Sequence, residues 1–171
     1  WLLDHEGDLY GQELTLEFYR YLRPERKFPS LAELQAEILK NGADKLVELG
    51  LDCVQIQCFT PELFTKENAD KVKNALDGKI RISSFWCGWT GPKIWNFTDG
   101  PQTLGLVPVA YRFQRMQELM LGADFASWLG VNDMATHVGF IPENPSTDEY
   151  RGVYGAVHKI ASYCKEKDIN F

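Results

Sequence analysis

Long apolar runs are missing from this chain of 171 residues. None reaches the roughly 18 consecutive apolar residues of a membrane-spanning helix, so we do not expect a membrane protein. Basic residues are also few, since 18 Lys and Arg stand against 24 Asp and Glu for a net charge of −6. A nucleic-acid surface needs a basic face. Nucleic acid is therefore not an expected partner.

Cysteine is scarce too, and its spacing excludes the common zinc patterns. The four cysteines are Cys53, Cys58, Cys87 and Cys164, and no two of them form C-x-x-C. Three of them lie in apolar stretches, which predicts reduced, buried thiols and a cytoplasmic protein. The composition, 44% hydrophobic and 25% charged, is typical of one globular domain or two small ones.

The first 50 residues predict a hairpin followed by a helix. Residues 13–22, ELTLEFYRYL, alternate between two faces and predict a strand. Residues 1–4 predict its antiparallel partner across a turn. Ser30 and Glu33 then form a capping box for a helix from about residue 31, and Gly50 is a good C-terminal stop. Asn41 and Gly42 interrupt the helical stripe, so one kinked helix and two short ones both remain open.

After Gly50 the pattern alternates between strands and helices. The expected strands are residues 52–58, 79–86 and 133–140, and the expected helices are residues 65–77, 106–129 and 147–167. Ser146 and Glu149 form a second capping box for the last helix. Residues 169–171 look like the start of another strand. Alternation of this kind predicts an α/β fold with a parallel sheet.

Residues 1–38 resemble the C-terminal end of a bacterial riboflavin kinase, as in the bifunctional riboflavin kinase/FAD synthetase. The motifs LLDHEGDLYG, LRPERKF and SLAELQAEI carry the resemblance. It implies the last part of a small β-barrel and its closing helix, in a family that uses ATP-Mg and makes FMN. Arg23 and Phe28 match positions of that family's flap near the flavin. We expect the family's nucleotide loop, magnesium site and catalytic glutamate to lie before Trp1.

Residues 43–171 resemble the sugar phosphate isomerase/epimerase family, which has a xylose isomerase-like TIM barrel. The motifs KLVELGLDCVQIQ, IRISSFW, LGAD and MATHVGF carry this resemblance. It implies a partial (βα)8 TIM barrel of about three parallel strands, preceded by the antiparallel hairpin and helix. The domains are then residues 1–41 and 42–171. The family uses a divalent metal, Mn or Mg, and we expect its first carboxylate ligand on a strand that follows this chain's end.

Polar and aromatic residues late in the strands are candidates for binding a sugar or sugar phosphate, because such barrels place their site there. Gln55 and Gln57 share one strand face, where they either bind sugar hydroxyls or face solvent. Trp86, Trp89 and Trp95 flank a Gly-rich loop, and their rings either stack on a sugar or pack over the mouth of the sheet.

His137 is the candidate metal ligand and a further substrate-binding residue, because the resemblance places an H-x-G at the end of this strand. The alternative is a hydrogen-bonded core histidine. A catalytic metal site needs about three protein ligands, and Asp133 and Glu143 do not complete such a set with it. His158 is expected on a helix flank, and the acidic turn around Asp8 is expected to be exposed.

Three functions remain open at this point. One is part of a sugar phosphate isomerase/epimerase, which moves a proton next to a carbonyl. A second is a riboflavin kinase fragment, and a third is a fusion product without catalysis. We expect the chain to be inactive in isolation and to bind neither parent family's cofactor tightly. A three-stranded parallel sheet exposes two edges, which favours self-association.

Overall fold

The computed structural model describes residues 11, 13, 15, 31–76 and 78–171, without the side chains of residues 31–39. The predicted hairpin and the capping box at Ser30 and Glu33 lie outside what is described. The described elements, in chain order, are α1 (Leu31–Glu48), β1 (Cys53–Cys58), η1 (Pro61–Leu63), α2 (Lys66–Leu76), β2 (Arg81–Cys87), α3 (Gly100–Thr103), α4 (Val109–Leu129), β3 (Met134–Ala135) and α5 (Asp148–Lys165).

The strands form a parallel sheet in the order β1-β2-β3. Cys58 pairs with Cys87, and Phe85 pairs with Met134. A register shift follows Val54, so two residues of β2 oppose one of β1 there. Asn170 forms a parallel bridge with Asp133, at the position where a fourth strand would pair beside β3. The predicted α/β fold with three parallel strands is therefore confirmed for the described part of the chain.

The third strand is much shorter than the predicted residues 133–140. After Ala135 the backbone turns toward the loop before α4, where the Val138 carbonyl accepts a hydrogen bond from the Leu106 amide at 2.6 Å. Gly139 has a φ of 104°, which an extended strand does not allow. Alternation in the sequence predicts a strand here, but the backbone hydrogen bonds of this segment go to a loop.

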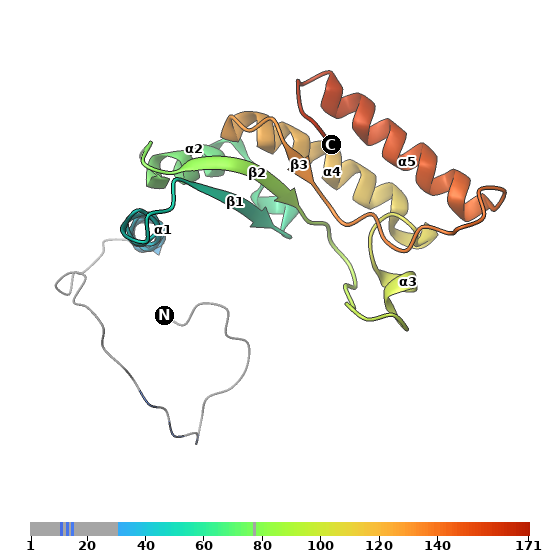
Figure 1. Ribbon diagram of the computed structural model, residues 1–171, viewed down its shortest axis with the longest axis horizontal. Coiled ribbons are helices and arrows are strands. Elements are labelled where there is room, and N and C mark those ends of the chain that lie inside the picture. Colours follow the sequence, from blue (N-terminus) through green and yellow to red (C-terminus); the bar gives the residue numbers. More distant parts are fainter. Residues whose placement is uncertain (1–10, 12, 14, 16–30, 77) are drawn as a thin grey trace.

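Helices cover one face of the sheet, with α2 and α4 against it and α5 beside α4 (Figure 1). The sheet residues on this face are buried, among them Phe85, Cys87 and Met134. Phe85 packs in a ring cluster with Phe64 and Phe125, with centroids 5.2–5.4 Å apart. None of the helices in the described part combines the length and hydropathy needed to cross a bilayer.

Helix α1 is a single helix that continues through Asn41 and Gly42. It packs on α2 through a small second core in which Ala43, Leu76 and Ile80 are buried and Leu46 contributes. Burial of these apolar groups stabilises the pairing of the two helices. The alternative of two short helices is therefore wrong.

Three helices end with the same backbone device. At the end of α1, the Gly50 amide bonds the Val47 carbonyl (2.9 Å) and the Leu51 amide bonds the Leu46 carbonyl (3.0 Å). This pair of bonds is the Schellman motif, which needs a left-handed residue, and Gly50 has a φ of 77°. The stop predicted at Gly50 is confirmed. The same pair of bonds recurs at Gly130 after α4 and at Asp168 after α5.

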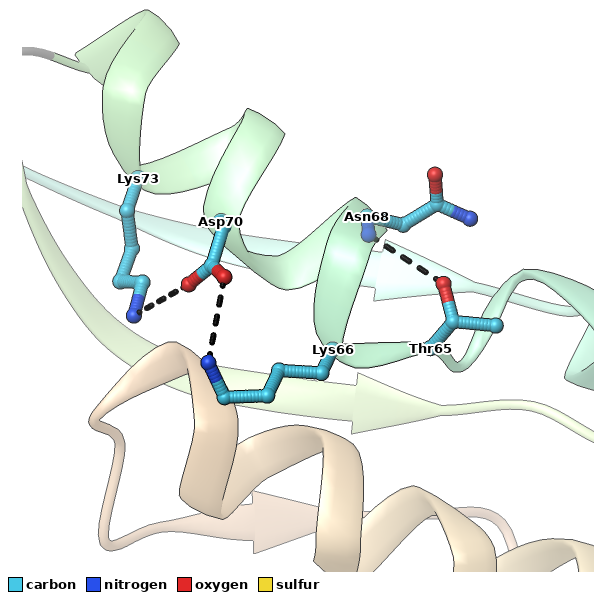
Figure 2. A network of polar contacts seen from close by, with 5 residues as sticks. All are labelled: Thr65, Lys66, Asn68, Asp70 and Lys73. Atoms are coloured by element: carbon cyan, nitrogen blue, oxygen red, sulfur yellow. Dashed lines mark hydrogen bonds and ion pairs between the residues drawn. The ribbon is translucent and has the colours of Figure 1, made fainter.

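Helix α2 is short and polar and is stabilised at its surface (Figure 2). Thr65 caps it, because its Oγ1 accepts a hydrogen bond from the Asn68 amide at 3.2 Å. Asp70 lies between Lys73 (3.0 Å) and Lys66 (3.4 Å). The hydrogen bond from Lys73 lowers the pKa of Asp70. These are exposed pairs, so the apolar face of α2 supplies most of its stability.

The cap of α5 is one residue later than predicted. Thr147 is the N-cap, and its Oγ1 accepts a hydrogen bond from the Tyr150 amide at 3.2 Å. Ser146 instead donates its amide to Asn144 Oδ1 at 3.0 Å. The predicted Ser146–Glu149 box is therefore wrong, because the Asn144 turn uses the Ser146 backbone before the helix begins.

Candidate functional site

Two loops meet at the carboxyl ends of β2 and β3. Residues 88–108, which contain α3, follow β2, and residues 136–141 follow β3. In Figure 1 the β2 arrow points toward the loop that carries α3. In parallel α/β sheets, ligands bind outside the carboxyl ends of the strands. We call this region the mouth.

The two loops touch backbone to backbone. Gly105 has a φ of 66°, and a Cβ built on it would lie 2.0 Å from the carbonyl carbon of Val138. Gly139 has a φ of 104°, and its Cβ would lie 2.5 Å from the Leu104 carbonyl oxygen. No other residue type fits either position. The mouth is therefore built as one unit from segments far apart in the sequence.

A continuous series of rings, here the aromatic arc, crosses the mouth. Successive ring centroids are 4.8–6.5 Å apart. These distances are typical of favourable aromatic pairs. The arc runs through Trp86, Phe59, Trp89, Trp95, His137, Phe140 and Phe97.

Trp95 is the exposed ring of the arc that contacts His137 directly. Its side chain is 55% exposed, and its plane meets the His137 ring nearly at a right angle, with centroids 5.0 Å apart. Trp86 is half-buried and contacts Phe59. Trp89 is fully buried. Its burial leaves no ring face for a sugar, and the stacking predicted for Trp86 and Trp95 stays a prediction.

His137 is half-buried and oriented by its own loop. Its Nδ1 accepts a hydrogen bond from the Gly139 amide at 3.1 Å. A ring whose Nδ1 is an acceptor carries its proton on Nε2 in the neutral form. Nε2–H is then a donor, suited to a hydroxyl or carbonyl oxygen. A metal ligand would instead use a nitrogen without a proton, so this hydrogen bond favours the donor role.

The donor set around His137 does not fit the divalent metal of the barrel family. Within residues 40–76 and 78–171, whose side chains are described, no group of three or more His, Cys, Asp or Glu side chains is placed to hold a metal ion. The metal role of His137 therefore stays a prediction, and this geometry supports a hydrogen-bonding role better.

Gln55 and Gln57 lie on the sheet face that the helices leave uncovered, and both are exposed. Gln55 Nε2 donates to Ser84 Oγ on the neighbouring strand at 2.8 Å. Gln57 pairs in register with Trp86, which ties it to the aromatic arc. Their predicted binding of sugar hydroxyls remains a prediction. His158 is exposed on α5, as expected for a helix flank.

Arg115 and Lys93 were missed by sequence reasoning. Arg115 is fully buried below the loop of residues 88–106. Its position one helical turn before buried Leu119 was a usable signal, since a charge on an apolar stripe needs a partner. Lys93 Nζ donates to the carbonyls of Trp89 (3.0 Å) and Gly91 (3.1 Å).

Comparisons with known proteins agree with the parallel α/β fold. The chain is similar to the xylose isomerase domain protein from Planctomyces limnophilus, with a TM-score of 0.66 and 26% identity over 71% of this chain and 43% of that one. The described fold is part of a xylose isomerase-like TIM barrel. A D-psicose 3-epimerase structure, determined in the presence of D-fructose, gives a TM-score of 0.52 at 12% identity over 77% of this chain and 45% of that one. The chain thus spans less than half the length of either barrel.

The N-terminal segment has a different relative. Residues 1–45 match the Flavokinase family, described as riboflavin kinase. The match ends inside α1, so both predicted resemblances are confirmed and they meet in one helix. Arg23 and Phe28 lie outside the described residues, and their flavin role stays a prediction. No curated protein matches the chain.

Proposed function

We propose that the mouth binds a sugar or sugar phosphate as part of an isomerase/epimerase-type barrel. The observation that carries this proposal is the pairing of the exposed Trp95 ring with His137 at the carboxyl ends of the strands. An aromatic face binds the apolar face of a sugar, and Nε2–H of His137 binds an oxygen at its edge. Gln57 and Trp86 extend the polar and apolar surface along the sheet.

The described residues supply binding and orientation rather than a complete reaction. Enzymes of this class move a proton next to a carbonyl and use a divalent metal, Mn or Mg, to polarise the substrate. The described residues around His137 do not gather the ligands for that ion. We therefore propose substrate binding without turnover for this chain alone.

Titration with D-fructose and D-fructose 6-phosphate, followed by saturation-transfer NMR, tests the proposal. Trp95→Ala and His137→Phe should each weaken binding by about tenfold, equivalent to about 1.4 kcal/mol. Tyr154→Ala is the matched control, because this ring is 64% exposed on α5. Equal binding by the wild type and the Trp95 variant would refute the site, and the two probes show whether a phosphate is needed.

A second candidate rests on the family match of residues 1–45 to riboflavin kinase. The flavin contact would come from Arg23 and Phe28. Adding the chain to riboflavin or FMN should then quench flavin fluorescence, and Arg23→Ala should reduce the quenching. Unchanged fluorescence at high protein concentration would reject flavin binding.

Self-association through the sheet edge is also proposed. In the described part of the chain, β1 pairs on one side only, with β2. A free parallel edge is a template for another chain. Sedimentation velocity across protein concentrations should show dimers, and a concentration-independent monomer would contradict this. All four cysteines are free, which supports the proposed cytoplasmic setting.

A further inference from the structure

Arg115 connects both ends of the loop that carries Trp95. Its Nε donates to the Thr90 carbonyl at 3.1 Å, and its Nη2 donates to the Pro92 carbonyl at 3.1 Å. Its Nη1 donates to the carbonyls of Thr103 (2.8 Å) and Gly105 (2.7 Å). Residues 90–92 leave β2, whereas residues 103–105 return toward α4. One planar guanidinium therefore holds the two legs of the loop together.

The same guanidinium lies under the aromatic arc. Its Cζ is 4.1 Å from the Trp89 ring centroid, which is a close cation–π contact. Trp89 stacks on Trp95, with centroids 6.5 Å apart and planes 26° apart. Trp95 then meets His137. A direct path of contacts runs from the buried charge to the proposed binding ring.

The energetics make this arrangement specific for arginine. A buried cation is strongly destabilising unless its donors are satisfied, so the four carbonyls must stay in place for the charge to stay buried. Lysine has one nitrogen and no planar fork. It cannot reach both legs and also stack on Trp89.

We propose that Arg115 is a positioning residue of the mouth, which holds Trp95 beside His137 by fixing both legs of its loop. The link to sugar binding rests on the function proposed above. The link to loop position does not, because it follows from the hydrogen bonds alone.

Arg115→Lys is the direct test, and amide hydrogen exchange is its first readout. The Leu104 and Leu106 amides, which bond Gly100 and Val138, should exchange about tenfold faster or more, equivalent to about 1.4 kcal/mol of local opening. Arg112→Lys is the matched control. Arg112 lies on the same helix and also bonds two loop carbonyls, but both belong to the returning leg. Arg112→Lys should therefore leave exchange at the Ile94 amide of the outgoing leg, which bonds Thr103 Oγ1, unchanged, whereas Arg115→Lys should speed exchange there as well.

Gly91→Ala disturbs the contact between the loop and the Arg115 guanidinium without removing the charge. A Cβ at Gly91 would lie 3.2 Å from Arg115 Nη2, at a φ of 86°. It should speed exchange in the loop as Arg115→Lys does. Gly50→Ala is its control, because Gly50 also has a positive φ, 77°, but its Cβ would meet nothing within 4 Å. Gly91→Ala decides the question if Arg115→Lys fails to fold.

Sugar titration is the second readout and separates the two proposals. Weaker D-fructose binding by about tenfold in Arg115→Lys, with Tyr154→Ala unchanged, supports the positioning role. Faster loop exchange with unchanged sugar binding overturns the positioning of Trp95 for the ligand. Unchanged exchange in both Arg115→Lys and Gly91→Ala overturns the role of Arg115 in holding the loop. If the wild type binds neither D-fructose nor D-fructose 6-phosphate, the sugar function fails, and the exchange data alone judge the loop role.

Discussion

Gly122 of α4 lies directly against the Cys87 side chain of β2. A Cβ at position 122 would lie 2.2 Å from Cys87 Sγ and 3.3 Å from Cys87 Cβ. Both residues are buried, and Cys87 is fully buried. The helix therefore approaches the sheet as closely as a glycine hydrogen allows, and the sulfur atom limits that approach.

This contact predicts strong coupling between two substitutions. Gly122→Ala should destabilise the fold by a net of about 2 kcal/mol, because overpacking costs about 3 kcal/mol and alanine returns about 1 kcal/mol of helix propensity. Cys87→Ala should cost about 1 kcal/mol for one lost apolar group. The double variant removes the sulfur and fills its space with the new methyl group. Its loss should be about 0–1 kcal/mol instead of the additive value of about 3 kcal/mol.

Urea unfolding of the four proteins measures the coupling, provided that the m-value stays constant. Gly155→Ala is the matched control, because a Cβ added to this helical glycine of α5 would meet nothing within 4 Å. It should stabilise the protein by about 0.5–1 kcal/mol. If the double variant loses as much unfolding free energy as the two single variants together, the close contact between α4 and β2 at Gly122 and Cys87 is refuted.

Three further predictions concern the last helix and its end. Thr147→Ala should lower the unfolding free energy by about 1 kcal/mol in urea titrations, whereas Ser146→Ala should change it by less than about 0.5 kcal/mol; the reverse order would restore the rejected capping box. Asp168→Gly should raise the free energy of unfolding by about 0.5 kcal/mol, because Asp168 has a left-handed φ of 56° that glycine adopts without strain. A lower melting temperature for this variant would contradict the prediction. Burial raises the pKa of the Cys164 thiol from 9.0 to about 11. The folded state keeps a proton that the unfolded state releases, so this stability is full below pH 9 and is lost as the pH rises toward 11. Cys164→Ala should flatten the fall in melting temperature over that range, and an equal fall in both proteins would exclude the effect.

The sequence predicted the repeating strands and helices well because hydrophobic periodicity over long segments is a strong signal. Helix α4 was expected at residues 106–129 and occupies Val109–Leu129. The errors occur where two local hydrogen-bonding options compete. Ser146 and Thr147 both match a capping residue, and the turn at Asn144 decided between them. Residues 136–140 alternate like a strand, but contacts to the preceding loop shorten β3.

The candidate site was predicted only in part for a different reason. Its location follows from the rule that parallel α/β folds bind ligands at the carboxyl ends of their strands. His137 and Trp95 lie together at these ends. Burial within a loop depends on which segments pack over it, and sequence spacing does not contain that information. Trp89 was therefore expected at a ligand and is found in the core, whereas buried Arg115 was not expected.

The recurring left-handed turn has a consequence for how such chains can be built. At Gly50, Gly130 and Asp168 the same two hydrogen bonds end a helix, and the next residue leads into a strand position. Helices α1, α4 and α5 thus connect to the next strand position through a turn of the same geometry. A helix before β1 has two structural requirements, which are apolar groups that face α2 and an end in this turn. The riboflavin kinase match ends at residue 45, five residues before Gly50, so the last turn of α1 and the glycine that ends it lie outside that match.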